Sequence, residues 1–224
     1  PRIAFLGVDR ETLIDQARYR MKERGEFLPP ASYSEVAQVD GLGVYTFCMC
    51  PGGIVAPCAT APEEVVTNGW SPSKRNNPFA NTGVVVEVKI EGGPLAGVEY
   101  QRKIERAAWE AGGKTQVAPG QRLVDFCEGR ISKDLPISSY PPGLASARVD
   151  ELLPKDIASR LQQALQVFGR RMRGYYTNDA VVIAVESRTS SPVRVPRNKE
   201  TLEHPTVRGL FPCGEGAGYA GGIV

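Results

Sequence analysis

The sequence contains a single histidine, His204, among 224 residues, and it contains no Cys-x-x-C pair. Zinc sites are usually built from several histidine and cysteine ligands at short spacing. The five cysteines are odd in number and irregularly spaced, which does not suit the disulfide framework of a secreted protein. We therefore expect no metal site, and we expect the thiols to be reduced.

The chain also lacks a strong excess of charge of one sign and lacks a long apolar run. Its 27 basic and 25 acidic residues leave a net charge of +2, so nucleic acid is not expected as the main partner. No apolar run approaches the roughly 20 residues that cross a bilayer, and residues 1–15 lack the apolar centre of a signal peptide. We expect a cytoplasmic protein with no membrane partner.

Periodic patterns predict an α+β fold, in which a mixed sheet is combined with about three main helices. The strongest helix runs over 154–173, with Pro154 at its first turn and Gly174 just beyond its last. Further helices are predicted over 11–24 and 100–112. Alternating or buried apolar runs predict strands around 44–49, 54–55, 63–69, 83–93, 180–187 and 209–213. Residues 113–153 are rich in proline and are expected to form a long loop or lid.

The last sixteen residues, GLFPCGEGAGYAGGIV, contain six glycines and one acid, Glu215. Glycine lets a backbone approach a ligand closely, and the free amides at a helix start can face phosphate or an electron-rich ring. A simple turn needs only one or two glycines. The segment therefore predicts a ligand site at the end of a strand.

Three other segments carry residues suited to chemistry. FCMCPGG at 47–53 presents Cys48 and Cys50, which a regular strand would place on one face. A redox role for this pair competes with the burial that is usual for free cysteine. TNGWSPSKR at 67–75 offers Asn68, Ser71 and Arg75 on a turn. ESRTSSPVRVPR at 186–197 follows a buried strand, where ligand groups tend to gather.

These motifs together resemble a family of uncharacterised bacterial FAD-dependent dehydrogenases, described as NAD(FAD)-utilising. The resemblance rests on FCMCPGG, on TNGWS with Arg75 and Asn81, and on APGQ and DF within 118–126. It also rests on AVVIAVESRTSSPVRVPR and GLFPCGEGAGYAGGIV, and it spans nearly the whole chain. Trp70 stands where the family pattern has methionine. The family's N-terminal dinucleotide-binding segment, with its G-x-G-x-x-G, is missing.

The resemblance implies an FAD site and an anion site. Glu215 would bind the ribityl hydroxyls of FAD, and a helix start would face the pyrophosphate or the pyrimidine edge of the ring. Arginines and hydroxyls after the buried strand would bind a carboxylate or phosphate of the substrate or of NAD(P)H, although such arginines also commonly pair with loop carbonyls and acids. The implied FAD residues are Gly214, Glu215, Gly216, Gly218, Gly221 and Gly222, and the implied anion residues are Arg188, Ser190, Ser191 and Arg194.

The resemblance also implies a domain division. Residues 1–204 are expected to form an inserted substrate or cap domain, and residues 205–224 to return into the FAD-binding domain. The partners would then be a small-molecule substrate and the missing N-terminal FAD-binding segment, and the isolated chain would have little activity. Two alternatives stay open: a protein- or RNA-binding module with a vestigial flavin site, and a thiol oxidoreductase that uses Cys48 and Cys50.

Overall fold

The structure is a computed structural model, and it describes residues 2–10, 15–16, 18–21 and 24–219. Its centre is a seven-stranded sheet with the strand order β2-β3-β6-β1-β9-β7-β8. Neighbouring strands are antiparallel except β7 and β8, which are parallel. The strands are β1 (Arg2–Arg10), β2 (Val36–Val39), β3 (Leu42–Cys50), β6 (Phe79–Glu87), β7 (Ala118–Arg122), β8 (Leu144–Ser146) and β9 (Val181–Glu186).

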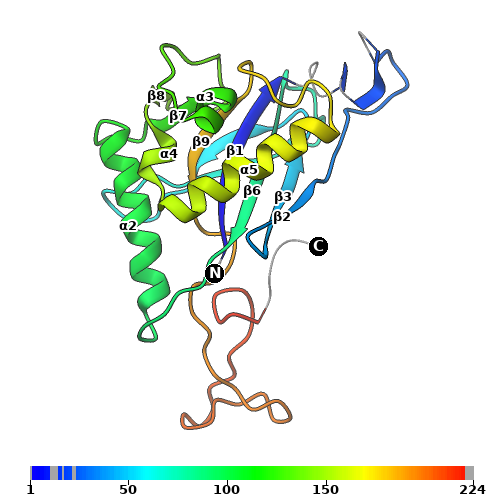
Figure 1. The fold of residues 1–224 in the computed structure, drawn as a ribbon. Helices are drawn as coiled ribbons and strands as arrows, with labels where there is room; N and C mark the ends of the chain where they lie inside the picture. The colour runs from blue at the N-terminus through cyan, green and yellow to red at the C-terminus, as the bar shows by residue number, and fades with distance from the viewer. Residues whose placement is uncertain (1, 11–14, 17, 22–23, 220–224) are drawn as a thin grey trace.

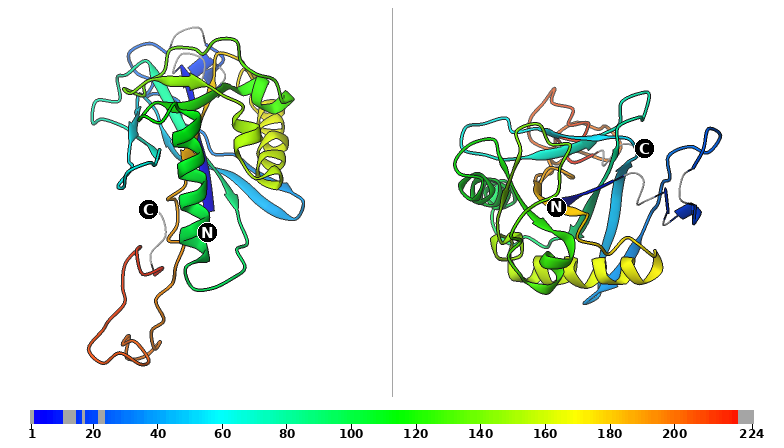
Figure 2. Two further views of the ribbon diagram at one scale, coloured as in Figure 1. Left: turned by 90° about the vertical axis from the view of Figure 1, so that its left-hand side faces the viewer. Right: turned by 90° about the horizontal axis from the view of Figure 1, so that it is seen from above.

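Different layers cover the two faces of this sheet. Helix α5 (Lys155–Arg171) crosses one face, together with the short helices α3 (Leu123–Glu128) and α4 (Val149–Leu152) (Figure 1). A small sheet of β4 (Ile54–Pro57) and β5 (Thr67–Trp70) lies over the opposite face, and α2 (Ala96–Ala111) flanks the side (Figure 2). Strands combined with separate helical layers confirm the α+β class.

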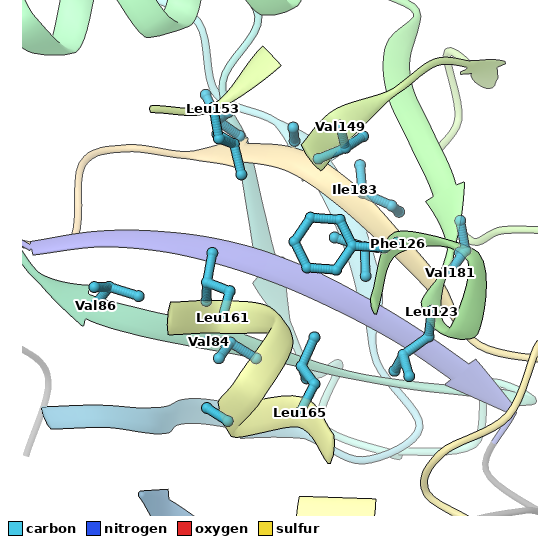
Figure 3. Close-up of a cluster of buried hydrophobic side chains, with 14 of the residues drawn as sticks. Val84, Val86, Leu123, Phe126, Val149, Leu153, Leu161, Leu165, Val181 and Ile183 are labelled. Carbon is cyan, nitrogen blue, oxygen red and sulfur yellow. The ribbon is translucent and has the colours of Figure 1, made fainter. Parts of the chain in front are cut away.

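The main core lies between the sheet and α5. Alternate residues of a strand point to the same face, so Val84 and Val86 of β6 both meet the helical layer (Figure 3). Leu161 and Leu165 lie one helical turn apart on α5 and pack against them. Phe126 of α3 fills the space nearer β9 and is 1% exposed. Burial of this stripe explains why the predicted helix 154–173 forms.

Several predicted elements are confirmed with small shifts at their ends. Helix α2 corresponds to the prediction at 100–112 and α5 to that at 154–173. Strand β9 corresponds to 180–187. The strands expected at 83–93 and 63–69 are displaced, because β6 begins at Phe79 and β5 begins at Thr67. Part of the helix expected at 11–24 falls on residues outside those described.

Two predictions were wrong. The stretch 113–153 contains β7, α3, β8 and α4 instead of forming one long loop. Strand β7 has the sequence APGQR, whose side chains show no alternation, and it is a strand because its backbone pairs with β9. The stretch 209–213 is not a strand: Phe211 is 58% exposed, and Pro212 has no amide proton to pair.

The first strand begins beside the end of the last one. Ala4 of β1 pairs with Glu186 of β9 in antiparallel register. Residues 187–219, which we call the C-terminal arm, then leave the sheet and extend away from it in both views (Figures 1 and 2). The chain thus enters and leaves the sheet at neighbouring points.

Candidate functional site

A bulge in β3 separates the environments of two thiols. The pairing of β3 with β6 shifts between Phe47 and Cys50, and Cys48 has a φ of 48°. As a result Cys48 is exposed while Cys50 is buried. The thiol of Cys50 donates a hydrogen bond to the carbonyl oxygen of Cys48 over 3.2 Å. Bulges commonly redirect side chains next to functional sites.

The turn after β3 packs tightly against the segment that follows β5. A Cβ atom on Gly52 would lie 2.0 Å from the carbonyl oxygen of Arg75, and one on Gly53 would lie 2.7 Å from that of Trp70. The hydroxyl of Ser71 donates to the carbonyl oxygen of Pro51 over 3.1 Å. Only glycine permits this approach. The structure therefore brings the predicted segments 47–53 and 67–75 together.

Glu186, the last residue of β9, borders the same region. Glu186 is 8% exposed, and its Oε2 atom makes no hydrogen bond to the side chains and backbone that the structure describes. Burial raises the pKa of this carboxyl from its ordinary value of 4.5 to about 7. A carboxyl that titrates near neutral pH is suited to general acid–base chemistry.

Burial also raises the pKa of the nearby thiols. For Cys48 and Cys58, partial desolvation by neighbouring atoms is the largest cause of the raised pKa, and the repulsion of Glu186 is the next. For Cys50, burial outweighs the hydrogen bond to Ser71 and the attraction of Arg75, both of which lower the pKa. These thiols are protonated at neutral pH, whereas the reactive form of cysteine is the thiolate. This electrostatic setting does not favour the thiol oxidoreductase alternative.

Arg188 lies beside this region, but its guanidinium is bound by protein acceptors. It donates to both carboxylate oxygens of Glu105, at 3.1 and 2.9 Å. It also donates to Glu64 over 2.8 Å and to the hydroxyl of Thr60 over 2.6 Å. Ser187 donates to Glu105 as well. In this structure Arg188 therefore joins α2, the segment before β5 and the start of the C-terminal arm.

The C-terminal arm folds back on itself and brings two predicted groups together. The hydroxyl of Ser191 lies 3.1 Å from the carbonyl oxygen of Gly216. A Cβ atom on Gly218 would lie 2.8 Å from the carbonyl oxygen of Val193, and Gly218 has a φ of 80°. The guanidinium of Arg194 stacks on the ring of Tyr219 at 4.7 Å. The structure thus places the predicted anion segment against the glycine-rich segment, while Ser190 is half-buried.

This contact forms a basic hollow of about 450 Å³. Arg197 also stacks on Tyr219, at 3.7 Å from the ring centre, and donates to the carbonyl oxygen of Pro212 over 2.7 Å. No ion pair to Arg194, Arg197 or Lys199 occurs within the described residues. Three cations without acidic partners suit an anionic group such as a phosphate. The hollow is lined by Arg194, Pro196, Arg197, Lys199, Leu202 and Tyr219.

The glycine-rich segment has room for a ligand beside it. A Cβ atom on Gly214 or Gly216 would meet no neighbouring atom of the described chain within 4 Å. Glu215 between them is exposed, and its side chain makes no ion pair among the described residues. An exposed carboxylate between glycines fits the hydroxyl groups of an FAD ribityl chain. Gly221 and Gly222 lie outside the described residues.

Two classes of feature are absent from the described part of the chain. No group of three or more histidine, cysteine, aspartate or glutamate side chains is arranged there to hold a metal ion. No helix among these residues has the length and apolar character needed to span a bilayer.

Comparison with known proteins identifies the family. A family model described as "FAD-dependent protein, C-terminal domain-like" matches residues 8–189. The chain belongs to this family. It is also 39% identical, over 222 residues, to a protein of Clostridium beijerinckii described as an uncharacterized protein. The match covers 96% of this chain and 42% of that relative, so the chain spans less than half of the relative's length. An FAD-associated domain is thereby established.

Sequence reasoning singled out most of this region but missed Glu186. It predicted the thiol segment, the turn at Ser71 and the arginine-rich segment as separate candidates. Glu186 lies within the predicted strand 180–187 and opens the motif at 186–197, but no role was predicted for it. An acid that ends a fully buried strand is uncommon, because an ionised carboxylate is costly to bury, and that feature could have marked the residue.

Proposed function

We propose that the chain is the substrate-side part of an FAD-dependent oxidoreductase. Residues 1–204 form an inserted domain over the flavin ring, and residues 205–224 return into the FAD-binding domain. The observation that carries this proposal is the pairing of Ala4 with Glu186, which puts the entry and exit of the sheet side by side. A domain inserted into another requires such neighbouring ends.

The cofactor site is proposed on the C-terminal arm. Glu215 accepts hydrogen bonds from the ribityl hydroxyls, and Gly214 and Gly216 leave room for them. Gly218, Gly221 and Gly222 present backbone amides toward the pyrophosphate or the pyrimidine edge of the ring. When bound, FAD supplies the capacity to accept or donate a hydride. The missing N-terminal segment supplies the rest of the FAD site.

The basic hollow is the proposed anion site. Its cations Arg194, Arg197 and Lys199 suit a phosphate of FAD or of NAD(P)H, or a carboxylate of the substrate. Arg188 is less suited to this role because Glu64 and Glu105 already occupy its donors. Ser190 and Ser191 lie at the start of the same segment. NAD(P)H is therefore proposed as a second redox partner through Arg194.

The substrate site is proposed at the β3 bulge. Cys48, Cys50 and Ser71 form one side of it, and Glu186 borders it from β9. A small molecule bound there would be shielded from water by the inserted domain, which strengthens electrostatic interactions during a dehydrogenase reaction. The chain alone, without its flavin segment, would be inactive.

The experiment joins the chain to its upstream FAD-binding segment and measures flavin absorbance after purification. The wild type should be yellow, and Glu215→Gln should weaken FAD binding roughly 10- to 100-fold, because a hydrogen bond to a charged group contributes about 1.5–3 kcal/mol. Glu200→Gln is the control, since Glu200 is an exposed acid of the same arm outside the glycine-rich segment. A colourless wild type that takes up no added FAD contradicts the proposal.

A further inference from the structure

Glu186 is buried in a different way from the other acids near it. Glu105 and Glu64 are also buried, but both are paired with Arg188. Glu186 has no ion pair within the described residues, and its Oε2 atom has no hydrogen-bond partner there. An unpaired buried polar atom costs folding free energy, because it has lost its hydrogen bonds to water. Such an atom calls for an explanation, and a catalytic role is one of those open to it.

The titratable groups described near Glu186 come from β3, the segment after β4, the turn after β5 and the start of the C-terminal arm. Cys48 and Cys50 belong to β3, and Cys58 follows β4; Glu186 influences the ionisation of all three thiols. The nearest cation along the chain is Arg188, which is bound to Glu64 and Glu105. Arg75 acts on Cys50 from the turn after β5. Among the residues whose side chains the structure describes, none therefore places a positive charge in an ion pair with Glu186.

We infer that Glu186 donates and accepts the proton at the substrate site between the β3 bulge and the turn at Ser71. The inference rests on the proposed function, because it assigns a role within the same site. It goes beyond that proposal by naming the residue that handles the proton. The supporting geometry is a carboxyl more than nine-tenths buried, with an oxygen that has no hydrogen-bond partner among the described side chains. Glu186 also repels the thiolate forms of Cys48, Cys50 and Cys58.

Other groups at this site are less suited to proton transfer at neutral pH. Burial raises the pKa of Cys48, Cys50 and Cys58 above the ordinary thiol value, so they do not exchange protons readily there. The guanidinium of Arg75 offers hydrogen-bond donors but no acceptor, and Ser71 carries an alcohol in place of an acid. Burial places Glu186 near pKa 7, where a carboxyl both holds and releases a proton.

The step balances for a quinone or a similar two-electron acceptor. Bound FAD would supply the hydride to one oxygen of the acceptor, and the Glu186 carboxyl would give its proton to the other oxygen. The products would be a hydroquinone, oxidised FAD and the Glu186 carboxylate. Water then restores the proton to Glu186. Oxidation of a substrate follows the reverse path, with the carboxylate as the base.

The first test uses the 224-residue chain without flavin. Carbon-13 NMR of labelled glutamate side chains follows each carboxyl with pH, and the resonance missing in Glu186→Gln assigns Glu186. We expect a midpoint near pH 7. In parallel, dicyclohexylcarbodiimide, an apolar reagent for protonated carboxyls, should label Glu186 at pH 6 and lose this labelling above pH 7. Labelled sites are mapped by mass spectrometry.

The controls are two acids of the same chain. Glu87 ends the neighbouring strand β6 with an exposed side chain, and Glu105 is buried but bound to Arg188. Neither should react with the carbodiimide, because one is hydrated and the other is ion-paired. A Glu186 midpoint near its ordinary value, or a carbodiimide that leaves Glu186 unlabelled at pH 6, overturns the inference. The carbodiimide labelling uses wild-type protein alone, so that result does not depend on how Glu186→Gln folds.

The second test uses the flavin-loaded protein, reduced by light and mixed with menadione. Glu186→Gln should reoxidise at least tenfold more slowly at pH 6 and lose the change in rate near pH 7, while Glu87→Gln behaves as wild type. Equal rates in Glu186→Gln and wild type overturn the transfer role. If no flavin is taken up, the proposed function fails instead, and the titration and labelling of the chain still decide whether Glu186 holds the proton.

Discussion

Arg188 and Glu105 form a double hydrogen-bonded ion pair that joins the end of β9 to helix α2. The two bonds measure 3.1 and 2.9 Å, and the Glu105 side chain is 2% exposed. The same guanidinium reaches Glu64, which precedes β5. One arginine therefore neutralises two buried carboxylates where the C-terminal arm leaves the sheet. An arginine here was expected either to bind a ligand or to pair with nearby acids, and its contacts match the second role.

Replacing Arg188 with methionine should destabilise the protein by about 2–3 kcal/mol. The change leaves Glu105 and Glu64 buried without a counter-ion. The expected loss of stability lies at the lower end of the range for broken buried ion pairs, because the Arg188 side chain is 34% exposed. Urea unfolding at pH 7 measures the loss. The control is Arg106→Met on the same helix, whose ion pairs with Glu63 and Glu110 lie in solvent, and it should change stability little. Equal, small losses in both variants would leave Arg188 available for an anion.

The pH dependence of stability should change when Glu186 becomes glutamine. Burial raises the pKa of this carboxyl from 4.5 to about 7, so between these values the folded protein holds a proton that the unfolded chain has released. The free energy of unfolding then falls as the pH rises, by about 1.4 kcal/mol per pH unit from this group. Glu186→Gln removes this slope. The difference in free energy of unfolding between the variant and the wild type should therefore shift in favour of the variant by about 3 kcal/mol from pH 4.5 to pH 8.

Denaturant unfolding at several pH values measures this effect. Glu87→Gln is the matched control, because Glu87 ends a neighbouring strand with an exposed side chain. It should follow the wild-type curve throughout. If the difference between Glu186→Gln and wild type is the same at pH 5 and pH 8, Glu186 does not titrate in this range and the raised pKa is wrong.

The sequence predicts elements whose own side chains decide their structure. Helix α5 is predictable because Ile157, Leu161 and Phe168 repeat at helical spacing and all become buried. Strand β9 is predictable because six consecutive residues are buried on both faces. In both cases the local pattern and the final environment agree.

Elements that depend on distant partners are not predictable in this way. Strand β7 contains Pro119 and Gly120, and it forms only because β9 and β8 pair with its backbone. The candidate site has the same limitation. The residue type of Cys48 indicates chemistry, but the bulge that exposes it comes from the register with β6. Burial of Glu186 likewise depends on strands far apart in the sequence.

Gly218→Ala should release the glycine-rich segment from the rest of the C-terminal arm. Its Cβ atom would lie 2.8 Å from the carbonyl oxygen of Val193, and its φ of 80° disfavours any residue with a side chain. Trypsin should then cut faster after Arg194 and Arg197, which now stack on Tyr219. The stability of the sheet should stay unchanged, because the arm lies outside the core.

Gly216→Ala is the control for this proteolysis. A Cβ atom there meets no described atom within 4 Å, and no positive φ is recorded for this glycine. Its cleavage rate should equal that of the wild type. If Gly218→Ala is also cut at the wild-type rate, the contact between Val193 and Gly218 does not hold the arm together.

The thiols should react in the order of their exposure and pKa. Cys48 is exposed, whereas Cys127 is buried and its pKa is raised to about 12, with burial as the main cause. Iodoacetamide reacts with thiolates, so at pH 8 it should alkylate Cys48 slowly and Cys127 not at all, as followed by mass spectrometry. The raised pKa of Cys48 also predicts that Cys48→Ser and Cys50→Ser keep flavin reoxidation by menadione within about threefold of wild type. Rapid alkylation of Cys48 below pH 7, together with loss of turnover in both serine variants, would instead support a thiol mechanism.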